Sequence, residues 1–278
     1  MRLLSDDTLW IFLLASSKEA EVRHIYDIAF GVTCLYQRNI NSDNIKLIID
    51  GDDFTIRSHL NQFPNFPMKS YYIFSSKDLK TIIQNSSHKN IVLFVTGHGN
   101  FEEGIDAPHP IKPYNLLNSV KCGKNTQNIV LYLGQCYAGI FNYLDVKGTP
   151  IIIIVGATNL YPSISYQFPD ISWQANLFLL NLFKWIKSPN DIDGDGKTTV
   201  MDSFKYAGAE TNRYCQLYKS LCLSRSIEIL EEMRSLDKEK ENLKRLALQE
   251  ELSSMQNIHY NSQEPWILNA IPAQLIEF

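Results

Sequence analysis

The chain has 278 residues, of which 45% are hydrophobic and 20% are charged, and its formal net charge at pH 7 is −4. This length can bury a substantial core, and a charge so near balance does not favour nucleic acid or an anionic membrane surface as a partner. Five scattered cysteines with no CxxC pair disfavour a disulfide framework or a zinc cluster, so we expect a reducing, cytoplasmic environment.

Short apolar runs recur along the chain, with segments of helical periodicity between them. The first run, 9–15, is too short to span a membrane and follows Asp6 and Asp7 rather than basic residues, which favours a core strand over a signal peptide. The alternation of the two kinds of segment predicts an α/β fold in which a mostly parallel six-stranded sheet carries helices on both faces. Strands are predicted at 8–15, 44–50, 69–74, 90–96, 127–133 and 150–155, and helices at 19–38, 54–63, 77–86, 114–121 and 173–187.

The C-terminal part of the chain contains a long segment of helical character. Residues 203–258 include no proline and only Gly208 as a glycine, and their intermittent apolar stripe falters near 237–242. A helical hairpin or bent arm therefore fits the pattern as well as one straight helix does. Because the segment from Glu264 onward is expected to return as a last strand, we predict one domain, 1–278, with this arm inserted before that strand. The charged face of the arm is either solvated or a docking surface for an activating protein.

Two short motifs follow neighbouring apolar runs. Thr-Gly-His-Gly-Asn, centred on His98, comes directly after the run 91–95, and Gly-Gln-Cys-Tyr-Ala-Gly, which contains Cys136, comes directly after the run 128–133. Apolar runs without alternation are typical of parallel strands buried on both faces, whose carboxyl ends line the ligand-binding edge of an open sheet. A cysteine is a strong nucleophile beside a base such as histidine, and glycines let backbone N–H groups face a developing oxyanion. The pattern predicts a cysteine hydrolase.

Three other interpretations fit less of this pattern. His98 and Cys136 could be loop and core residues without chemistry, but both lie in glycine-flanked turns after neighbouring runs. In class I glutamine amidotransferases the base follows the nucleophile in a His-x-Glu element, whereas here only His259 lies downstream, with Asn261 in place of the glutamate. A metal site would need further ligands close by, and His109 is the only one near in sequence.

With the histidine upstream of the cysteine, the two motifs resemble those of the caspase-fold (clan CD) cysteine peptidases, and most closely those of bacterial legumain-like peptidases. The resemblance implies a caspase-like three-layer fold. It also implies that the Cys136 thiolate attacks the scissile carbonyl and that His98 acts as base and acid. The backbone N–H groups of Gly99 and Cys136 would form the oxyanion hole. In this fold the dyad usually lacks an essential third carboxylate, so none is predicted.

The substrate pocket is expected in the segment that follows the strand at 150–155. Metacaspases carry an aspartate two residues before the nucleophile, whereas this chain has Gly134, so a pocket for a basic P1 residue would need acidity from elsewhere. No arginine lies between Arg57 and Arg213, which disfavours a caspase-like pocket for an acidic P1 residue. The candidate pocket residues are Tyr161, Ser163, Ser165 and Asp170, and further acidic candidates are Glu102, Glu103 and Asp106.

The segment 191–202 fits the twelve-position calcium loop of EF-hands at most positions. Three carboxylates at alternate positions would repel one another without a cation, which favours Ca²⁺ or Mg²⁺. The last position holds Asp202 rather than glutamate, and the shorter side chain makes bidentate closure harder. The alternative is a solvated turn that caps the following helix. The expected ligands are Asp191, Asp193, Asp195, Lys197 through its carbonyl, Thr199 and Asp202.

Three functions are compatible with the sequence. The first is a cysteine endopeptidase that hydrolyses protein or peptide substrates through the Cys136–His98 dyad and a thioester acyl-enzyme, supported by Ca²⁺. The second is a transamidase or peptide ligase on the same dyad, in which an amine intercepts the acyl-enzyme. The third is a catalytically silent scaffold that binds calcium or a protein partner.

Overall fold

The structure is a computed structural model that describes residues 2–67, 71–167, 171–236, 241–258 and 263–278. Contacts within the chain divide it into two compact units, one of Met1–Gly208 with Glu264–Phe278 and one of Ala209–Gln263. The sequence predicts one domain with an inserted arm, and the second unit covers most of that arm.

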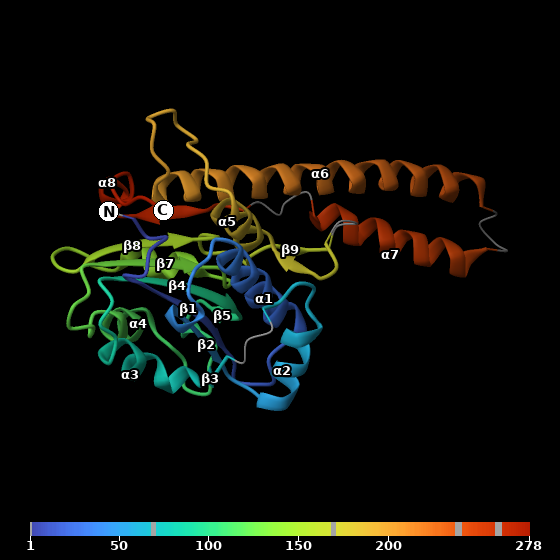
Figure 1. The fold of residues 1–278 in the computed structure, drawn as a ribbon. Coiled ribbons are helices and arrows are strands. Elements are labelled where there is room, and N and C mark those ends of the chain that lie inside the picture. Colours follow the sequence, from blue (N-terminus) through green and yellow to red (C-terminus); the bar gives the residue numbers. More distant parts are fainter. Residues whose placement is uncertain (1, 68–70, 168–170, 237–240, 259–262) are drawn as a thin grey trace. The chain divides into compact units, whose positions relative to one another are not determined.

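The first unit is built around a seven-stranded sheet with the strand order β11-β8-β7-β4-β1-β2-β3 (Figure 1). Neighbouring strands are parallel except β11, which pairs antiparallel with β8. The predicted α/β fold with a mostly parallel sheet is confirmed, although the sheet has seven strands in place of six because the returning segment joins its edge. The strands of this sheet are β1 (Thr8–Ala15), β2 (Ile45–Ile49), β3 (Ile73–Phe74), β4 (Asn90–Gly97), β7 (Asn128–Leu133), β8 (Ile151–Gly156) and β11 (Trp266–Leu268), and the short pairs are β5 (Gly99–Asn100) with β6 (Gly104–Ile105) and β9 (Ser165–Tyr166) with β10 (Ala175–Asn176).

Helices connect these strands with bounds close to those expected. The helix predicted at 173–187 begins later, at Leu177, because the two residues before it form β10 and the Asn176 side chain accepts a hydrogen bond of 3.0 Å from the Leu179 N–H. Such a side chain satisfies one of the unpaired N–H groups of the first turn and fixes where the helix starts. The helices of the first unit are α1 (Val22–Gln37), α2 (Asp53–Gln62), α3 (Leu79–Gln84), α4 (Pro113–Val120), α5 (Leu177–Lys187) and α8 (Ala270–Ala273), with short 3-10 turns at η1 (Ser42–Asn44), η2 (Ser76–Asp78) and η3 (Ala138–Tyr143).

The β3 edge of the sheet is shorter than the sequence suggests. Of the strand predicted at 69–74, only Ile73–Phe74 pairs with β2, while residues 69 and 70 lie outside the described residues. The helix predicted at 77–86 is divided into η2 and α3. Both differences fall at the edge of the sheet furthest from β8 and leave its centre unchanged.

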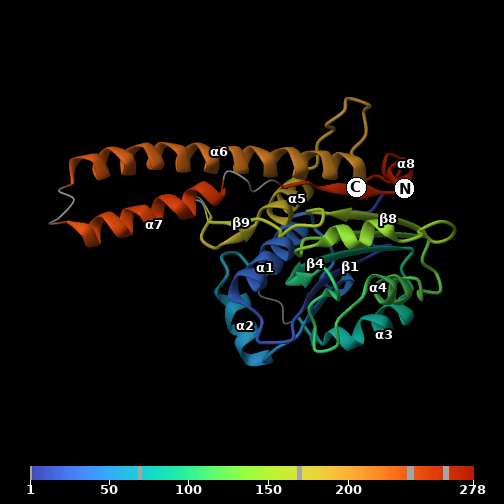
Figure 2. The ribbon, with the colours of Figure 1, turned by 180° about the vertical axis from the view of Figure 1, so that it is seen from behind.

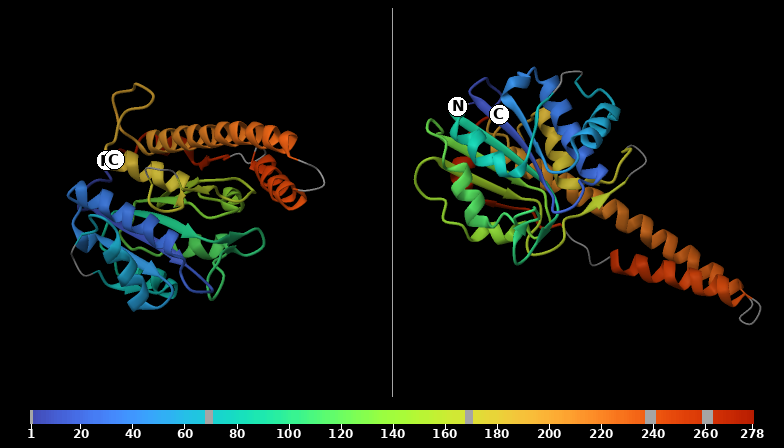
Figure 3. Two further views of the ribbon diagram at one scale, coloured as in Figure 1. Left: turned by 90° about the vertical axis from the view of Figure 1, so that its right-hand side faces the viewer. Right: turned by 90° about the horizontal axis from the view of Figure 1, so that it is seen from below.

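Both faces of the sheet are buried, which explains the unbroken apolar runs. In β1, Trp10 and Phe12 belong to one hydrophobic cluster, and Leu9 and Ile11 belong to another. Helices α1 and α5 contribute to the first cluster, and α3 and α4 to the second, so helices cover both faces as predicted (Figure 3). Because side chains alternate along a strand, such burial requires apolar residues at every position. The carboxyl ends of β1, β4 and β7 consequently share one edge of a rigid sheet.

The second unit is a helical hairpin. Its helices are α6 (Val200–Ser235), which begins in the first unit, and α7 (Asn242–Ile258), and they lie side by side (Figures 1 and 2). The Arg225 Nε lies 2.9 Å from Glu251 Oε1, and the Lys244 Nζ lies 2.9 Å from Glu232 Oε1. The hairpin form of the predicted arm is therefore the one found, and the docking partner stays a prediction. In the described part of the chain, no helix combines the length and apolar character needed to cross a lipid bilayer.

Candidate active site

The two motifs end neighbouring strands at matched positions. Strands β4 and β7 are paired in parallel with Val95 opposite Leu133, and His98 and Cys136 each lie three residues beyond these partners. The Gly134 N–H donates a hydrogen bond of 2.8 Å to the Val95 carbonyl and continues the pairing into the second turn. Neighbouring strands are about 4.8 Å apart, so the structure places the histidine turn and the cysteine turn side by side.

Gly99 is required by the close approach of these two turns. A Cβ at this position would collide with the carbonyl oxygen of Cys136 and would lie 2.7 Å from Cγ of Gln135. The backbones of the two turns are therefore packed against each other, and no side chain fits at position 99. Directly after Cys136, Tyr137 adopts a left-handed conformation with φ of 57°, and the chain turns sharply there.

The Cys136 thiol is half-buried and faces the segment that follows β8. Its Sγ accepts a hydrogen bond of 3.3 Å from the backbone N–H of Ser163. A second bond joins the same two segments, from the Tyr137 N–H to the Tyr161 carbonyl at 2.9 Å. The segment expected to form the substrate pocket thus contacts the cysteine turn directly.

Of the candidate pocket residues that the structure describes, Ser163 is the one that bonds to Cys136. The Tyr161 side chain is exposed, and Ser165 lies in β9, where its carbonyl accepts a hydrogen bond from the Gln174 side chain. Asp170 lies outside the described residues. Of the acidic candidates, Glu102 and Glu103 donate backbone N–H bonds to Asn100 in a local turn. The Asp106 side chain accepts bonds from the N–H and hydroxyl of Ser17, which is 89 residues away in sequence.

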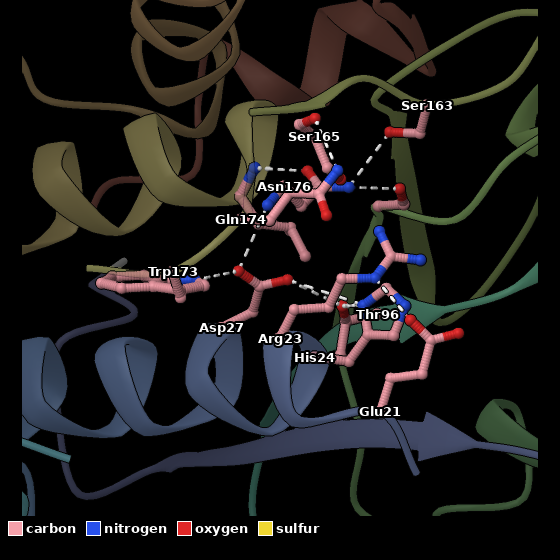
Figure 4. A network of polar contacts seen from close by, with 12 residues as sticks. Glu21, Arg23, His24, Asp27, Thr96, Ser163, Ser165, Trp173, Gln174 and Asn176 are labelled. Atoms are coloured by element: carbon pink, nitrogen blue, oxygen red, sulfur yellow. Dashed lines mark hydrogen bonds and ion pairs between the residues drawn. The ribbon is translucent and has the colours of Figure 1, made fainter. Parts of the chain in front are cut away.

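A carboxylate that the sequence did not reveal holds His98. Oε1 of Glu21, the residue that precedes α1, lies 2.6 Å from Nε2 of His98, while Arg23 Nε lies 2.6 Å from Oε2 (Figure 4). The hydrogen bond from Arg23 is the main cause that lowers the pKa of Glu21 to about 2, and the bond from His98 adds to it. Glu21 is therefore ionised at neutral pH. Its separation of 77 residues from His98 explains why no motif joins the two.

Asp27, on α1, is the centre of a network of buried polar groups. The Asp27 side chain, which is 2% exposed, accepts hydrogen bonds from Trp173 Nε1 at 2.9 Å, from the Asn176 N–H at 3.2 Å and from the Thr96 hydroxyl at 3.2 Å (Figure 4). The Thr96 hydroxyl also lies 3.2 Å from Nδ1 of His24. Buried polar groups with such partners rigidify the elements that they join, which here are α1, β4 and the start of α5.

The same network reaches the cysteine turn through Asn176. Its side-chain NH₂ donates to the Gly134 carbonyl at 2.7 Å and to the Ser163 hydroxyl at 3.0 Å. Asn176 therefore links Gly134, two positions before Cys136, to the segment that contacts the thiol. The sequence offers one signal for this network, since His24 and Asp27 are polar residues one turn apart on the buried face of α1.

The acidic loop gathers only some of its expected ligands. Carboxylate oxygens of Asp191, Asp193 and Asp195 lie within 4.8 Å of one another, so these three could hold a cation. Asp202 does not join them: it is fully buried and accepts hydrogen bonds from the Ile192 N–H, the Thr199 N–H and the Thr199 hydroxyl. Three of the six predicted ligands are thus close together, Asp202 and the Thr199 hydroxyl bond to each other, and the Lys197 carbonyl stays a prediction.

The three clustered carboxylates already have partners in the loop or in the helix that follows it. Asp191 accepts backbone bonds from Gly194 at 2.7 Å and Gly196 at 2.8 Å, which lower its pKa. The Lys205 Nζ lies 2.6 Å from Asp193 Oδ2 and offsets part of the negative charge. A cation in this loop would compete with Lys205 for Asp193.

A pocket of about 500 Å³ lies at the opposite end of the strands. It is lined by residues at the starts of β1 and β2 and before β4, among them Leu9, Lys46 and His88. The ring nitrogens of His88 contact Ser86 and Asn44, and burial lowers its pKa. Because this pocket is remote from the carboxyl ends of β4 and β7, it adds nothing to the site around Cys136.

The arrangement at the carboxyl edge can support nucleophilic chemistry. It combines a half-buried thiol, an imidazole held by a carboxylate, and two backbone turns in close contact. Any functional conclusion depends on this geometry. No protein-family model matches the chain, and no curated protein matches its sequence.

Proposed function

We propose that the protein is a cysteine endopeptidase of caspase-like architecture, with Cys136 as the nucleophile and His98 as the general base. The observation that carries the proposal is the matched position of the two residues beyond paired strands, with Nε2 of His98 held by Glu21. The resemblance of both motifs to those of caspase-fold peptidases supports the choice of a peptide bond as the substrate.

The bond to Glu21 determines which ring nitrogen of His98 can act as the base. An ionised carboxylate only accepts hydrogen bonds, so at 2.6 Å the Nε2 must carry the proton. In the neutral ring Nδ1 then holds the lone pair and can take the proton of the Cys136 thiol. Glu21 acts as a positioning residue, because it fixes the tautomer and the orientation of the base without touching the substrate.

The reaction follows from these positions. Nδ1 of His98 takes the thiol proton as Sγ forms a bond to the scissile carbonyl carbon, and backbone N–H groups of Gly99 and Cys136 stabilise the oxyanion. The C–N bond then breaks, and His98 gives its proton to the leaving amine. Water attacks the thioester in the same way, with His98 taking its proton, and releases the carboxylic acid and the free thiol.

The acidic loop has a supporting role in this proposal. Asp191, Asp193 and Asp195 would hold Ca²⁺ or Mg²⁺ in place of the ammonium of Lys205, and the ion would hold the loop that precedes α6. Because Asp202 caps the first turn of that helix, the ion would lack the closing carboxylate of an EF-hand and bind weakly. The chain has five free cysteines, which suits a reducing compartment such as the cytoplasm.

The test is digestion of a peptide library by the purified protein, with and without Ca²⁺, read by mass spectrometry. Cleavage that is present in the wild type and lost in Cys136→Ala would support the proposal and reveal the P1 residue in the same spectra. Cys122→Ala is the matched control, because Cys122 is also half-buried but lies outside the site.

Other outcomes separate the alternatives. An added amine that becomes joined to the new carboxyl terminus would identify a transamidase on the same acyl-enzyme. Absence of cleavage, together with no labelling of Cys136 by an electrophilic thiol probe, would contradict the peptidase and leave a scaffold.

A further inference from the structure

We propose that Glu21, His24 and His98 form a binding site for Zn²⁺, and that zinc bound there blocks the base of the dyad. One ligand atom from each of these residues lies within 4.8 Å of the others. Two imidazoles and a carboxylate, with an open fourth position, are a set of protein ligands that Zn²⁺ uses in proteins. No short sequence motif contains the site, because two of its ligands come from the start of α1 and the third follows β4.

His24 supplies an observation that points to a ligand. The residue is 4% exposed, and its Nε2 is buried without a hydrogen-bond partner among the described residues. An unpaired nitrogen in such a place costs free energy, and few remain in folded proteins. A metal ion that accepted its lone pair would remove this cost.

The neighbours of His24 favour the tautomer in which this nitrogen carries the lone pair. The Thr96 hydroxyl donates its proton to Asp27 Oδ2, so toward Nδ1 of His24 it can only accept. Nδ1 therefore carries the ring proton, and Nε2 is left unprotonated. Asp27 Oδ2 also lies 3.7 Å from Nδ1. A metal-binding histidine is usually held in this way, with its other nitrogen bonded to a hydroxyl, carbonyl or carboxylate behind it.

The distances are compatible with a tetrahedral ion after small movements of two side chains. Bonds of 2.0 to 2.1 Å place neighbouring ligand atoms about 3.3 Å apart. The shortest separation in the site is 2.6 Å, between His98 Nε2 and Glu21 Oε1, and both side chains are 47% exposed and free to adjust. His24 is fixed by burial and by Thr96, so it would provide the rigid part of the site (Figure 4).

The charge around the site is balanced. Arg23 and the positive end of α1 oppose a cation, while the Glu21 carboxylate and the buried Asp27 favour one. Arg23 bonds to Oε2 of Glu21, which leaves Oε1 facing His98 and available to the metal. The two imidazoles then decide the preference for zinc over Ca²⁺ or Mg²⁺, which prefer oxygen ligands.

Zinc in this site would prevent proton transfer from the thiol. A neutral ring has a single ring proton and can bind a metal through Nε2 only as the tautomer that carries this proton on Nδ1, so the hydrogen bond from Nε2 to Glu21 is lost. Nδ1 is the nitrogen that must accept the Cys136 proton, so the ring changes from a base to a donor. This inhibition rests on the proposed function, whereas metal binding itself does not.

Metal binding is measured on the full chain after removal of bound metal with a chelator and gel filtration. Zn²⁺ affinity is read by competition with a chromogenic chelator, and Co²⁺ is titrated separately to record its visible absorption bands. We expect one tight site, the intense bands of tetrahedral Co²⁺, and no thiolate-to-cobalt charge-transfer band. His24→Gln should lower the Zn²⁺ affinity at least about 100-fold, as is typical when such a group is lost.

Four further variants make the result specific. Glu21→Gln changes an exposed ligand and should also weaken binding, which keeps the test valid if the buried His24 variant fails to fold. His88→Gln changes a half-buried histidine before the opposite end of β4 and should bind zinc as the wild type does. Cys136→Ser and Asp191→Asn should also keep the site, because neither the thiol nor the acidic loop belongs to it.

The outcomes distinguish this inference from the proposed function. Unchanged zinc affinity in both His24→Gln and Glu21→Gln, or loss of binding in Cys136→Ser, would overturn the zinc site. Neither result would bear on the proposed peptidase function. Tetrahedral Co²⁺ in a protein that cleaves no peptide would support the site and contradict only the peptidase. Where cleavage is found, Zn²⁺ should inhibit it at the affinity measured by competition, and inhibition should be relieved by a chelator.

Discussion

The carboxyl edge of the sheet and the acidic loop both collect titratable side chains, and they are built in opposite ways. At the sheet edge, three separate parts of the chain meet: the start of α1, the turn after β4 and the turn after β7. In the acidic loop, all the carboxylates come from 191–202, and most bonds to them come from the loop itself. Among the described residues, His24 Nε2 at the sheet edge has no hydrogen-bond partner, whereas the loop carboxylates accept bonds from the loop backbone and from Lys205.

This difference indicates where chemistry is concentrated. A loop whose carboxylates accept its own backbone N–H groups is stable with or without an ion, so an ion there changes little. A site assembled by the sheet holds groups that local structure does not need, and such groups are available for reaction or for ligands. Substitutions at the sheet edge should therefore affect function strongly, and substitutions in the loop should affect mainly stability.

The largest effect is expected for His98→Ala. Loss of the base should lower kcat/KM for the cleaved peptide about 10²- to 10⁴-fold, the usual contribution of general acid–base catalysis. Because the side chain is half-exposed, the free energy of unfolding in urea should stay near that of the wild type. A variant that keeps wild-type kcat/KM would place the chemistry elsewhere.

A smaller loss is expected for Glu21→Ala, about 10- to 100-fold in kcat/KM, because one charge-assisted hydrogen bond to the base is removed. Glu21→Gln should recover part of the activity, since its amide oxygen can still accept from Nε2. The pKa of Glu21 is lowered to about 2, so its bonds to Arg23 and His98 are complete above the ordinary pKa of 4.5 and are lost as pH falls through about 2. Ionisation of Glu21 should therefore add no step of its own to the ratio of wild-type to Glu21→Ala activity between about pH 5 and 9. Wild-type kcat/KM in Glu21→Ala would contradict the role given to Glu21.

Asp27→Ala tests the rigidity of the sheet edge. The substitution leaves the N–H groups of Trp173 and Asn176 without a partner, and we expect a loss of about 3 kcal/mol in the free energy of unfolding. Asp145→Ala is the matched control, because this exposed aspartate bonds only to the Lys147 N–H among the described residues, and its change should stay below about 0.5 kcal/mol. Equal losses in the two variants would mean that the network does not stabilise the fold.

The smallest effect is expected in the acidic loop. Ca²⁺ at a hundredfold excess over its Kd should raise the Tm of the wild type by about 5 °C, and Asp191→Asn should abolish this shift. Lys205→Met removes the ammonium that competes for Asp193 and should strengthen Ca²⁺ binding. If Ca²⁺ leaves the Tm of all three proteins unchanged, the loop is a turn rather than a cation site.

Much of the fold could be predicted from the sequence because its strands are buried on both faces. The apolar runs that end at Val95 and Leu133 are interrupted by no polar residue, and the side chains that follow them must share one edge of the sheet. The resemblance of the two motifs then assigned roles to His98 and Cys136. These roles depend on short stretches of chain, which sequence patterns describe well.

The remaining parts of the site depend on contacts between distant segments. Glu21 and Asp27 meet His98 and Thr96 only because α1 packs beside β4, and no spacing in the sequence encodes that contact. Asp202 shows a limit of short-range sequence patterns. A carboxylate three residues after Thr199 can serve equally well as a cation ligand or as a helix cap. The structure uses it as a cap, with both oxygens occupied by N–H and hydroxyl donors.

The central claim, that His98 activates Cys136, is tested most directly by alkylation rates at each cysteine. The protein is treated with chloroacetamide at neutral pH, and labelling is followed by peptide mapping in wild type and in His98→Ala. Cys34 and Cys122 are internal references, because burial raises the pKa of Cys34 to about 12 and also raises that of Cys122. We predict that Cys136 reacts at least about tenfold faster than either reference, and that this advantage disappears in His98→Ala. A rate at Cys136 that matches Cys122, or that is unchanged without His98, would contradict the account.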